Sequence, residues 1–292
     1  MILVTTPTGN TGSMVLQQLV ERGQKVRIFL RDPKKISAEI LEKVEVATGS
    51  LLNEDEFTEA LQGCDTLYFC VPQSNTQEDV NAYYEEFATV ASQAIKNAGT
   101  SRVIYLSSGG KENNLQAGLI TALHKGEDII IRSGASVRSL RCPVFFETLL
   151  YQIASLKKSG TFFLPIDGNY KSPQIAVKDI AAKAVELLTD KTWKGVEGVT
   201  IQGPADISYN EIAFQVSELT GKPFHFQQVS KEDYIETLLV EHHTSEAFAI
   251  SLTEMLTAIG NGLYDTEPRT EESTTSTTIR EWLKENLVSK IN

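Results

Sequence analysis

A glycine-containing stretch near the N-terminus is the first part of the sequence whose residue types suggest chemistry. It reads Thr5-Thr6-Pro7-Thr8-Gly9-Asn10-Thr11-Gly12 and separates the apolar run Ile2–Thr5 from the amphipathic segment Thr11–Arg22. A dinucleotide's pyrophosphate needs a tight strand-to-helix turn, bare backbone and free N–H groups at a helix N-terminus. Gly9 and Gly12 serve the last two needs, whereas Thr6 replaces the usual first glycine. The pattern predicts a dinucleotide loop; the alternative is a tight turn that binds another phosphate, or nothing.

Arg31 follows the second apolar run, Val26–Leu30, where a dinucleotide-binding fold recognises the ribose. Enzymes that use NAD place an acid there, about 20 residues after the loop, to bond the ribose hydroxyls. A guanidinium suits a 2′-phosphate instead, because it offers a planar fork of donors and a permanent charge. Strand alternation turns Asp32 elsewhere, and Lys34 and Lys35 add positive potential. These residues favour NADP(H); the alternative is that Arg31 is a solvated strand-end residue.

Apolar runs alternate with helical patterns through the first half of the chain. The runs are β-branched and apolar with little alternation, which is typical of strands buried on both faces of a sheet; they are Ile2–Thr5, Val26–Leu30, Val44–Ala47, Thr66–Val71, Val103–Ser107 and Val137–Leu140. The helical patterns between them are Thr11–Arg22, Glu54–Leu61, Val80–Ala98 and Ile120–Arg132. The order predicts an α/β fold with a doubly wound parallel Rossmann sheet, whose ligands lie beyond the carboxyl ends of the strands.

The pattern changes after Cys142-Pro143, and a smaller region follows. We expect helices at Phe145–Lys157, Asp179–Leu188, Ser208–Leu219 and from Lys231 onward, and short strands at Val199–Gln202 and Phe224–Gln228. The Thr-, Glu- and Ser-rich stretch Thr266–Thr278 is the best candidate for a mobile loop. We therefore expect a Rossmann domain over residues 1–150 and a smaller C-terminal α/β substrate or lid region over residues 151–292. The boundary is approximate and leaves room for segments that return to the first sheet.

Composition limits the classes of partner. The 292 residues carry a formal net charge of −11, which disfavours nucleic acid and anionic membranes, since both select clustered Lys and Arg. No apolar run approaches the roughly 20 residues of a membrane span, and the N-terminus lacks the basic start of a signal peptide. Three cysteines without metal-like spacing disfavour a disulfide framework. We expect a cytoplasmic protein without metal whose partner is a small-molecule substrate, and we leave a homodimer open.

Several motifs occur in the order of a known family. They are Thr8-Gly9-Asn10-Thr11-Gly12, Val26–Pro33, Val103–Gly109, His124-Lys125-Gly126-Glu127, Leu140–Glu147, Ile175–Ala181 and Gly203-Pro204. In these motifs the chain resembles the NmrA-like family of atypical short-chain dehydrogenases/reductases, and the resemblance covers nearly the whole chain. That family includes NAD(P)H-dependent quinone reductases and redox-sensing regulators that bind the cofactor without obvious turnover.

The resemblance implies a set of cofactor-binding residues. Thr6, Gly9, Asn10, Thr11 and Gly12 would line the pyrophosphate, and Arg31 would meet the 2′-phosphate. Ser50 and Leu51 would lie near the adenine, Val71 and Pro72 would pass under the ribose and nicotinamide, and Pro143 and Phe146 would wall the nicotinamide pocket. The expected strands support this assignment independently, because these segments fall at their carboxyl ends.

The proton donor of short-chain reductases is missing. These enzymes place a Tyr four residues before a Lys on one helix face, where the Lys lowers the pKa of the Tyr and holds the ribose. Lys125 fits the Lys position, but Thr121 stands in place of the Tyr. Two further groups could act near the substrate: His124, which titrates near neutrality, and Ser107, which could bond a carbonyl. A packed or surface histidine and a serine that ends its strand are the alternatives.

Three functions fit this sequence. The first is an NADPH-dependent oxidoreductase that transfers hydride to a small, apolar, electron-poor acceptor, with a quinone as the first choice and an activated alkene or imine next. The second is a non-catalytic NADP(H)-binding redox sensor of the NmrA type, which the missing Tyr favours. The third is a sugar-nucleotide epimerase or dehydratase, which the missing Tyr disfavours because that chemistry needs a base on the sugar hydroxyl.

Overall fold

A seven-stranded parallel sheet forms the centre of the molecule in the computed structural model, which describes residues 1–291. The strand order is β10-β6-β5-β4-β1-β2-β3, and every pairing in it is parallel. The strands are β1 (Ile2–Thr5), β2 (Val26–Leu30), β3 (Glu45–Thr48), β4 (Thr66–Phe69), β5 (Arg102–Ser108), β6 (Ser136–Cys142) and β10 (Val196–Thr200). This is the Rossmann-type α/β fold that the sequence predicts.

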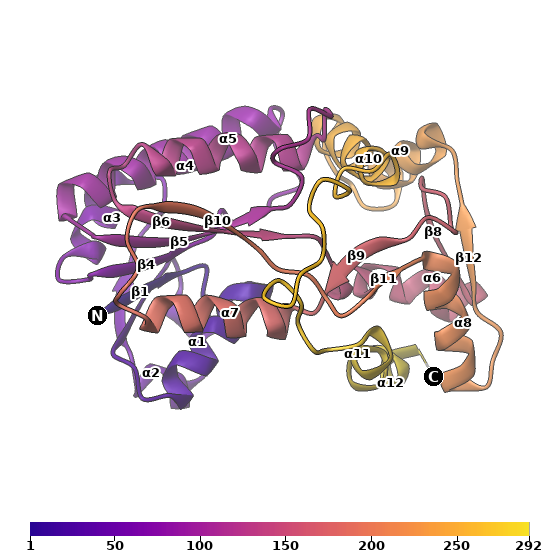
Figure 1. The fold of residues 1–292 in the computed structure, drawn as a ribbon, viewed down its shortest axis with the longest axis horizontal. Coiled ribbons are helices and arrows are strands. Elements are labelled where there is room, and N and C mark those ends of the chain that lie inside the picture. The colour runs from indigo at the N-terminus through magenta and orange to yellow at the C-terminus, as the bar shows by residue number, and fades with distance from the viewer. Residues whose placement is uncertain (292) are drawn as a thin grey trace.

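Helices cover both faces of the sheet (Figure 1). One face packs against α3 (Glu54–Leu61), α4 (Val80–Ala98) and α5 (Leu119–Ile131), through a core that includes Phe57, Ala91 and Ile130. The other face packs against α1 (Asn10–Glu21) and α7 (Val177–Thr189), with a short α2 (Ala38–Leu41) beside them. Since β1, β4 and β5 are buried on both sides, their apolar composition follows from their position.

Two segments from the second half of the chain join the seven-stranded sheet and the helices that cover it. Strand β10 pairs with β6 and adds a seventh strand at the edge of the sheet, where six were expected. Helix α7 lies alongside α1 under the sheet (Figure 1). The Rossmann-type layers are therefore assembled from both halves of the sequence.

The remaining elements form a smaller C-terminal region with two small sheets, ordered β11-β9-β7 and β12-β8. Its strands are β7 (Val144–Phe145), β8 (Thr161–Leu164), β9 (Ser172–Ile175), β11 (Asp206–Ile207) and β12 (His225–Gln228). Its helices are α6 (Ile153–Ser159), α8 (Tyr209–Thr220), α9 (Lys231–Val240), α10 (Glu246–Gly260), α11 (Ile279–Asn286) and α12 (Val288–Ile291). None of the helices within residues 1–291 is both long and apolar enough to cross a bilayer.

One expectation for this region is wrong. The segment Phe145–Lys157 is not one α-helix, because Phe145 pairs in β7 and a 3-10 helix over Phe146–Gln152 precedes α6. The segment Thr266–Thr278 contains no helix or strand, as a loop requires, and hydrogen bonds join it to the rest of the protein; its mobility stays a prediction. Gln202 N–H donates to the Ser273 carbonyl (2.7 Å), and the Thr277 hydroxyl donates to Asp179 (2.7 Å).

Candidate cofactor and active site

The loop between β1 and α1 is a tight turn built around Thr6. Thr6 has φ of +48°, a conformation that costs a non-glycine residue about 1–2 kcal/mol and explains why glycine is usual there. Its carbonyl accepts the Gly9 N–H at 2.9 Å. A Cβ on Gly12 would lie 2.2 Å from the same carbonyl oxygen, so only glycine fits at that position. The loop thus brings Thr6, Gly9 and Gly12 together as the sequence predicts.

The N-terminus of α1 has free hydrogen-bond donors. Gly9 occupies its N-cap and supplies no side-chain bond, and the first turn holds no acidic residue. Side chains of the N-cap residues cap α3, α4, α8, α9, α10 and α11, whereas α2, α5, α6 and α7 lack such a cap, as α1 does. Exposed Gly9 and Asn10 leave this helix end open to solvent, and Thr11 is buried beneath it. Uncapped N–H groups and the helix dipole together fit a pyrophosphate.

Arg31 lies directly beyond the last residue of β2 and is exposed. Asp32 is turned away from that position, because its carboxylate accepts the Lys34 N–H (3.0 Å) and caps the short 3-10 helix Pro33–Lys35. Lys34 and Lys35 are exposed on the same helix. The end of β2 therefore presents cations next to the phosphate loop, as a 2′-phosphate requires.

The next two strand ends carry the other segments expected at the cofactor. Ser50 and Leu51 follow β3, and the Ser50 N–H donates to the Glu56 carboxylate at 2.8 Å. Val71 and Pro72 follow β4, where Val71 is buried. The four residues lie at the same edge of the sheet as the phosphate loop, because all the strands are parallel.

Helix α5 places the expected lysine, Lys125, beside a carboxylate of α4. Lys125 Nζ lies 3.3 Å from the Glu85 carboxylate on α4, and both side chains are about half exposed. Its charge is thus engaged in a surface ion pair between two helices. The Thr121 oxygen accepts the Ala117 N–H (3.0 Å) and so caps the start of the helix. Both side chains therefore have partners within the protein, and the role of Lys125 at the cofactor stays a prediction.

The ring of His124 faces the sheet. Its Nε2 lies 2.9 Å from the Ser108 carbonyl at the end of β5. Burial lowers the pKa of His124 below the usual 6.5, and this effect outweighs the Ser108 contact and the nearby Glu127, which act in the opposite direction. The imidazole is therefore neutral at neutral pH and fixes the end of β5.

Ser107 is buried and donates its hydroxyl proton to Glu127 at 2.6 Å. It points toward α5 and is not free to bond a substrate carbonyl in this conformation. The Glu127 carboxylate also accepts a hydrogen bond from the Arg141 guanidinium (2.9 Å) and lies 3.3 Å from Lys111 Nζ. Sequence reasoning gave Glu127 no role, although a Glu three residues after His124 on the sheet-facing side of a helix was an available signal.

The two residues expected to wall the nicotinamide pocket are buried. Pro143 separates β6 from β7, and Phe146 is 2% exposed. The Phe146 ring packs against Trp282 at 5.9 Å in the core of the C-terminal region. Phe146 therefore packs the core of the C-terminal region, and its role as a wall of the nicotinamide pocket stays a prediction.

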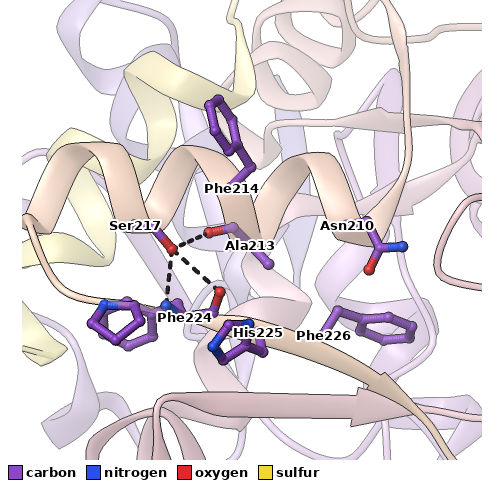
Figure 2. Close-up of a pocket in the computed structure, with 8 residues that line it drawn as sticks. Asn210, Ala213, Phe214, Ser217, Phe224, His225 and Phe226 are labelled. Carbon is purple, nitrogen blue, oxygen red and sulfur yellow. Dashed lines mark hydrogen bonds between the residues drawn. The ribbon is translucent and has the colours of Figure 1, made fainter.

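A surface pocket of about 390 Å³ lies between α8 and β12 (Figure 2). Its lining includes Phe214, Phe224, His225 and Phe226. The Ser217 hydroxyl donates to the Ala213 carbonyl (2.9 Å) and accepts the Phe224 N–H (2.8 Å), which ties the strand to the helix. None of the residues expected to bind cofactor or substrate lines this pocket, so it stands apart from the candidate site.

Comparison with known proteins gives a consistent group. An azoreductase that uses NAD(P)H, from Xenophilus azovorans, is 26% identical over 232 residues, covering 80% of this chain and 78% of its own. An NADPH-dependent quinone oxidoreductase from Escherichia coli, solved with NADPH, superposes with a TM-score of 0.84 at 20% identity and covers 98% of this chain and 99% of its own. A triphenylmethane reductase from Citrobacter, solved with NADP(H), gives 0.82 at 20% identity with the same coverage.

A further structure shares the fold under another name. It is called a nucleoside-diphosphate-sugar epimerase, from Staphylococcus aureus, and has a TM-score of 0.83 at 19% identity over 97% of this chain and 99% of its own. At such identities the solved structures establish the fold and not the reaction. The family is established separately, because the model of the NmrA-like family matches residues 1–283. The chain belongs to the NmrA-like family.

Proposed function

We propose that this protein is an NADPH-dependent oxidoreductase that reduces a small, apolar, electron-poor acceptor by hydride transfer. One observation carries the proposal. The first turn of α1 has no side-chain cap and contains Gly12, where a Cβ would collide with the Thr6 carbonyl, and exposed Arg31 follows the neighbouring strand β2. The names of the azoreductase and the quinone oxidoreductase support it. The bound cofactor would supply the hydride. The backbone of Gly9–Gly12 would hold its pyrophosphate, and Arg31 its 2′-phosphate.

The side chains around α5 offer no strong proton donor, and this limits which acceptors the site can reduce. The Ser107 proton is committed to Glu127, His124 is neutral, and Thr121 is a weak acid. An acceptor that needs no protein acid suits such a site. A quinone is the first candidate, since its oxygens take protons from water, and an activated alkene or imine is next. A cationic acceptor, such as a triphenylmethane dye, needs the hydride alone.

The lack of a free acid around α5 favours a second function, a redox sensor that binds NADP(H) without turnover. A site without a free acid is compatible with binding alone. An epimerase is disfavoured, because its chemistry needs a base on the sugar hydroxyl and Thr121 occupies the position of the usual Tyr.

Turnover and binding measured side by side separate these functions. We expect the purified protein to consume NADPH, followed by absorbance, with at least one member of a panel of quinones and a triphenylmethane dye. Gly12→Ala should abolish both binding and turnover, because its Cβ collides with the Thr6 carbonyl. Gly23→Ala is the control: it lies just beyond the other end of α1, with φ of +65° and no atom within 4 Å of the new Cβ, so it should cost about 1 kcal/mol of stability but keep both binding and turnover. Tight NADPH binding without turnover on any acceptor would support the sensor and contradict the enzyme.

A further inference from the structure

The loop after β5 is joined by hydrogen bonds to segment 262–267, which follows α10 in the C-terminal half of the chain. The Glu267 carboxylate accepts the Gly110 N–H at 2.9 Å. The side-chain amide of Asn113 donates to two backbone carbonyls of the segment, at 3.1 and 3.3 Å. Segment 262–267 is therefore fastened just beyond the carboxyl end of β5.

Two buried glycines in the loop after β5 give the segment room to approach. A Cβ on Gly109 would lie 2.7 Å from Glu267 Oε2 and 3.1 Å from the ring of Tyr264. A Cβ on Gly110, which has φ of +79°, would lie 2.6 Å from the Leu263 side chain. A side chain at position 109 would thus displace the Glu267 carboxylate or the Tyr264 ring.

This contact lies next to the expected nicotinamide end of the cofactor site. The Gly109 N–H donates to the Cys142 carbonyl at 3.0 Å, and the Ser108 hydroxyl donates to the same carbonyl at 3.2 Å. Cys142 directly precedes Pro143, which is expected to wall the nicotinamide pocket. Ligands of a parallel sheet lie beyond the carboxyl ends of its strands, so an acceptor that meets the nicotinamide would lie beside segment 262–267.

The anchor of Glu267 is a neutral N–H group and not a cation. Among residues 1–291, Glu267 forms no ion pair, although Arg141 pairs with two other carboxylates nearby. Burial raises the pKa of Glu267, and the Gly110 N–H and Arg141 only partly oppose that rise. Its negative charge is thus poorly compensated, and a neutral side chain that keeps an acceptor oxygen can take its place.

We propose that Glu267 is a positioning residue for the acceptor: its bond to the Gly110 N–H holds segment 262–267 against the end of β5, where the segment forms one wall of the acceptor site and limits acceptor size. The proposal rests on the proposed function and deepens it by assigning the wall that selects the substrate. The wall acts on the acceptor and not on the phosphates of the cofactor, because β4 separates β5 from the strands β1 and β2 that carry the phosphate loop and Arg31.

Steady-state kinetics of Glu267 variants test the wall with the smallest and the bulkiest acceptor that the wild type reduces. Glu267→Ala should raise the KM of the small acceptor about 5- to 10-fold, while kcat and the dissociation constant of NADPH stay within about 2-fold. The kcat/KM of the bulky acceptor relative to the small one should rise at least about 5-fold, because the wall recedes. Glu267→Gln should keep wild-type values, since its amide oxygen accepts the same N–H. Glu271→Ala removes an exposed carboxylate four residues further on and is the matched control, without effect on KM.

Gly109→Ala reaches the same wall from the side of the sheet. Its Cβ would meet Glu267 Oε2, so it should displace the segment and raise the KM of the small acceptor as Glu267→Ala does. In the Glu267→Ala background that oxygen is absent, and the added Cβ should have a smaller effect on KM. Two independent losses of stability would add instead, so this double-mutant cycle separates positioning from general damage to the fold.

The outcomes that overturn the positioning role differ from those that overturn the proposed function. If Glu267→Gln does not keep the wild-type KM, if Glu267→Ala leaves both KM and acceptor preference unchanged, or if the effects of Gly109→Ala and Glu267→Ala add fully, Glu267 does not position the wall through Gly110. If the wild type itself reduces no acceptor, the proposed function falls and the positioning role falls with it. Thermal unfolding of each variant verifies folding.

Discussion

Glu127 is 1% exposed and is surrounded by donors from three other segments of the chain. Ser107 lies on β5, Arg141 lies on β6, and Lys111 follows β5. Burial pushes the pKa of Glu127 upward, but the bonds from Arg141 and Ser107 and the Lys111 charge outweigh it, and the net shift is below the ordinary 4.5. Removing a buried carboxylate with this many partners costs stability, because each partner would be left without its acceptor. It fixes the carboxyl ends of β5 and β6, next to the candidate site.

Glu127→Gln should therefore destabilise the fold by about 2 kcal/mol at neutral pH, since a neutral amide no longer balances the two cations. The folded pKa is lowered, so the contribution of the carboxylate is fully present above the ordinary value and disappears as the pH falls through the folded pKa. The stability difference between wild type and variant should accordingly shrink below about pH 4.5. Thermal unfolding from about pH 7 to about pH 3 measures it.

Glu45→Gln serves as the control, because Glu45 pairs with Arg27 but its own side chain is 59% exposed. Surface pairs contribute about 0–1 kcal/mol, so this variant should follow the wild type closely at every pH. A Glu127→Gln curve that runs parallel to the wild type through the acid range would show that the Glu127 carboxylate is not the stabilising form.

At the scale of elements, α10 carries the C-terminal region onto the nucleotide-binding layers. Gly118 begins α5 with φ of +47°, and a Cβ there would lie 1.9 Å from the Ser251 carbonyl oxygen of α10. The N-cap of α10 is tied to the loop after β4, because the Ser245 N–H donates to the Asn75 carbonyl at 2.8 Å. Helix α10 thus touches both α5 and the loop that carries Pro72.

Gly118→Ala should lower the free energy of unfolding by about 3 kcal/mol, from the strained φ together with the backbone collision. Gly134→Ala is a matched control, since Gly134 has φ of +84° but no atom within 4 Å of the new Cβ. It should cost about 1 kcal/mol, for the conformation alone. Chemical denaturation of both variants measures the difference, and equal losses would contradict the close approach of α10 to α5.

Local patterns predicted the elements of the first half well. The bounds of β1, β2, α3 and α4 agree with the expectation, because turn residues bracket each apolar run or helical pattern. The prediction of one helix over Phe145–Lys157 was wrong for a tertiary reason. The apolar spacing there is helical, but Phe145 lies in β7 and pairs with β9. The edge position of β10 was also out of reach, since a strand's choice of partner depends on contacts distant in sequence.

The candidate site could be predicted in part, where it depends on residues adjacent in sequence. The phosphate loop follows from residues adjacent in sequence, and the structure assembles it as expected. The environments of Lys125 and Ser107 could not be derived. A shift of one position around α5 decides whether Lys125 meets the sheet or solvent, and the partner of Ser107 lies 20 residues away on another element. Thr6 shows the opposite case: the sequence could only note that it replaces a glycine, whereas the structure shows that it keeps the positive φ for which glycine is usual.

For the whole molecule, charge is distributed unevenly. The chain carries a formal net charge of −11, yet the end of β2 presents Arg31, Lys34 and Lys35, all exposed. The acid within this segment, Asp32, is occupied as a helix cap. An anionic nucleotide is therefore attracted to one edge of an otherwise acidic protein, the edge where every strand of the sheet ends beside the uncapped α1.

Titration of the purified protein with NADPH and with NADH, for wild type and Arg31→Ala, tests the central claim most directly. The wild type should prefer NADPH, and Arg31→Ala should weaken NADPH about 10- to 100-fold while changing NADH less than about 2-fold. Arg132→Ala removes an exposed positive charge just beyond the end of α5 and should leave both affinities unchanged. Equal losses for the two cofactors in Arg31→Ala, or a wild type that binds neither, would contradict the account.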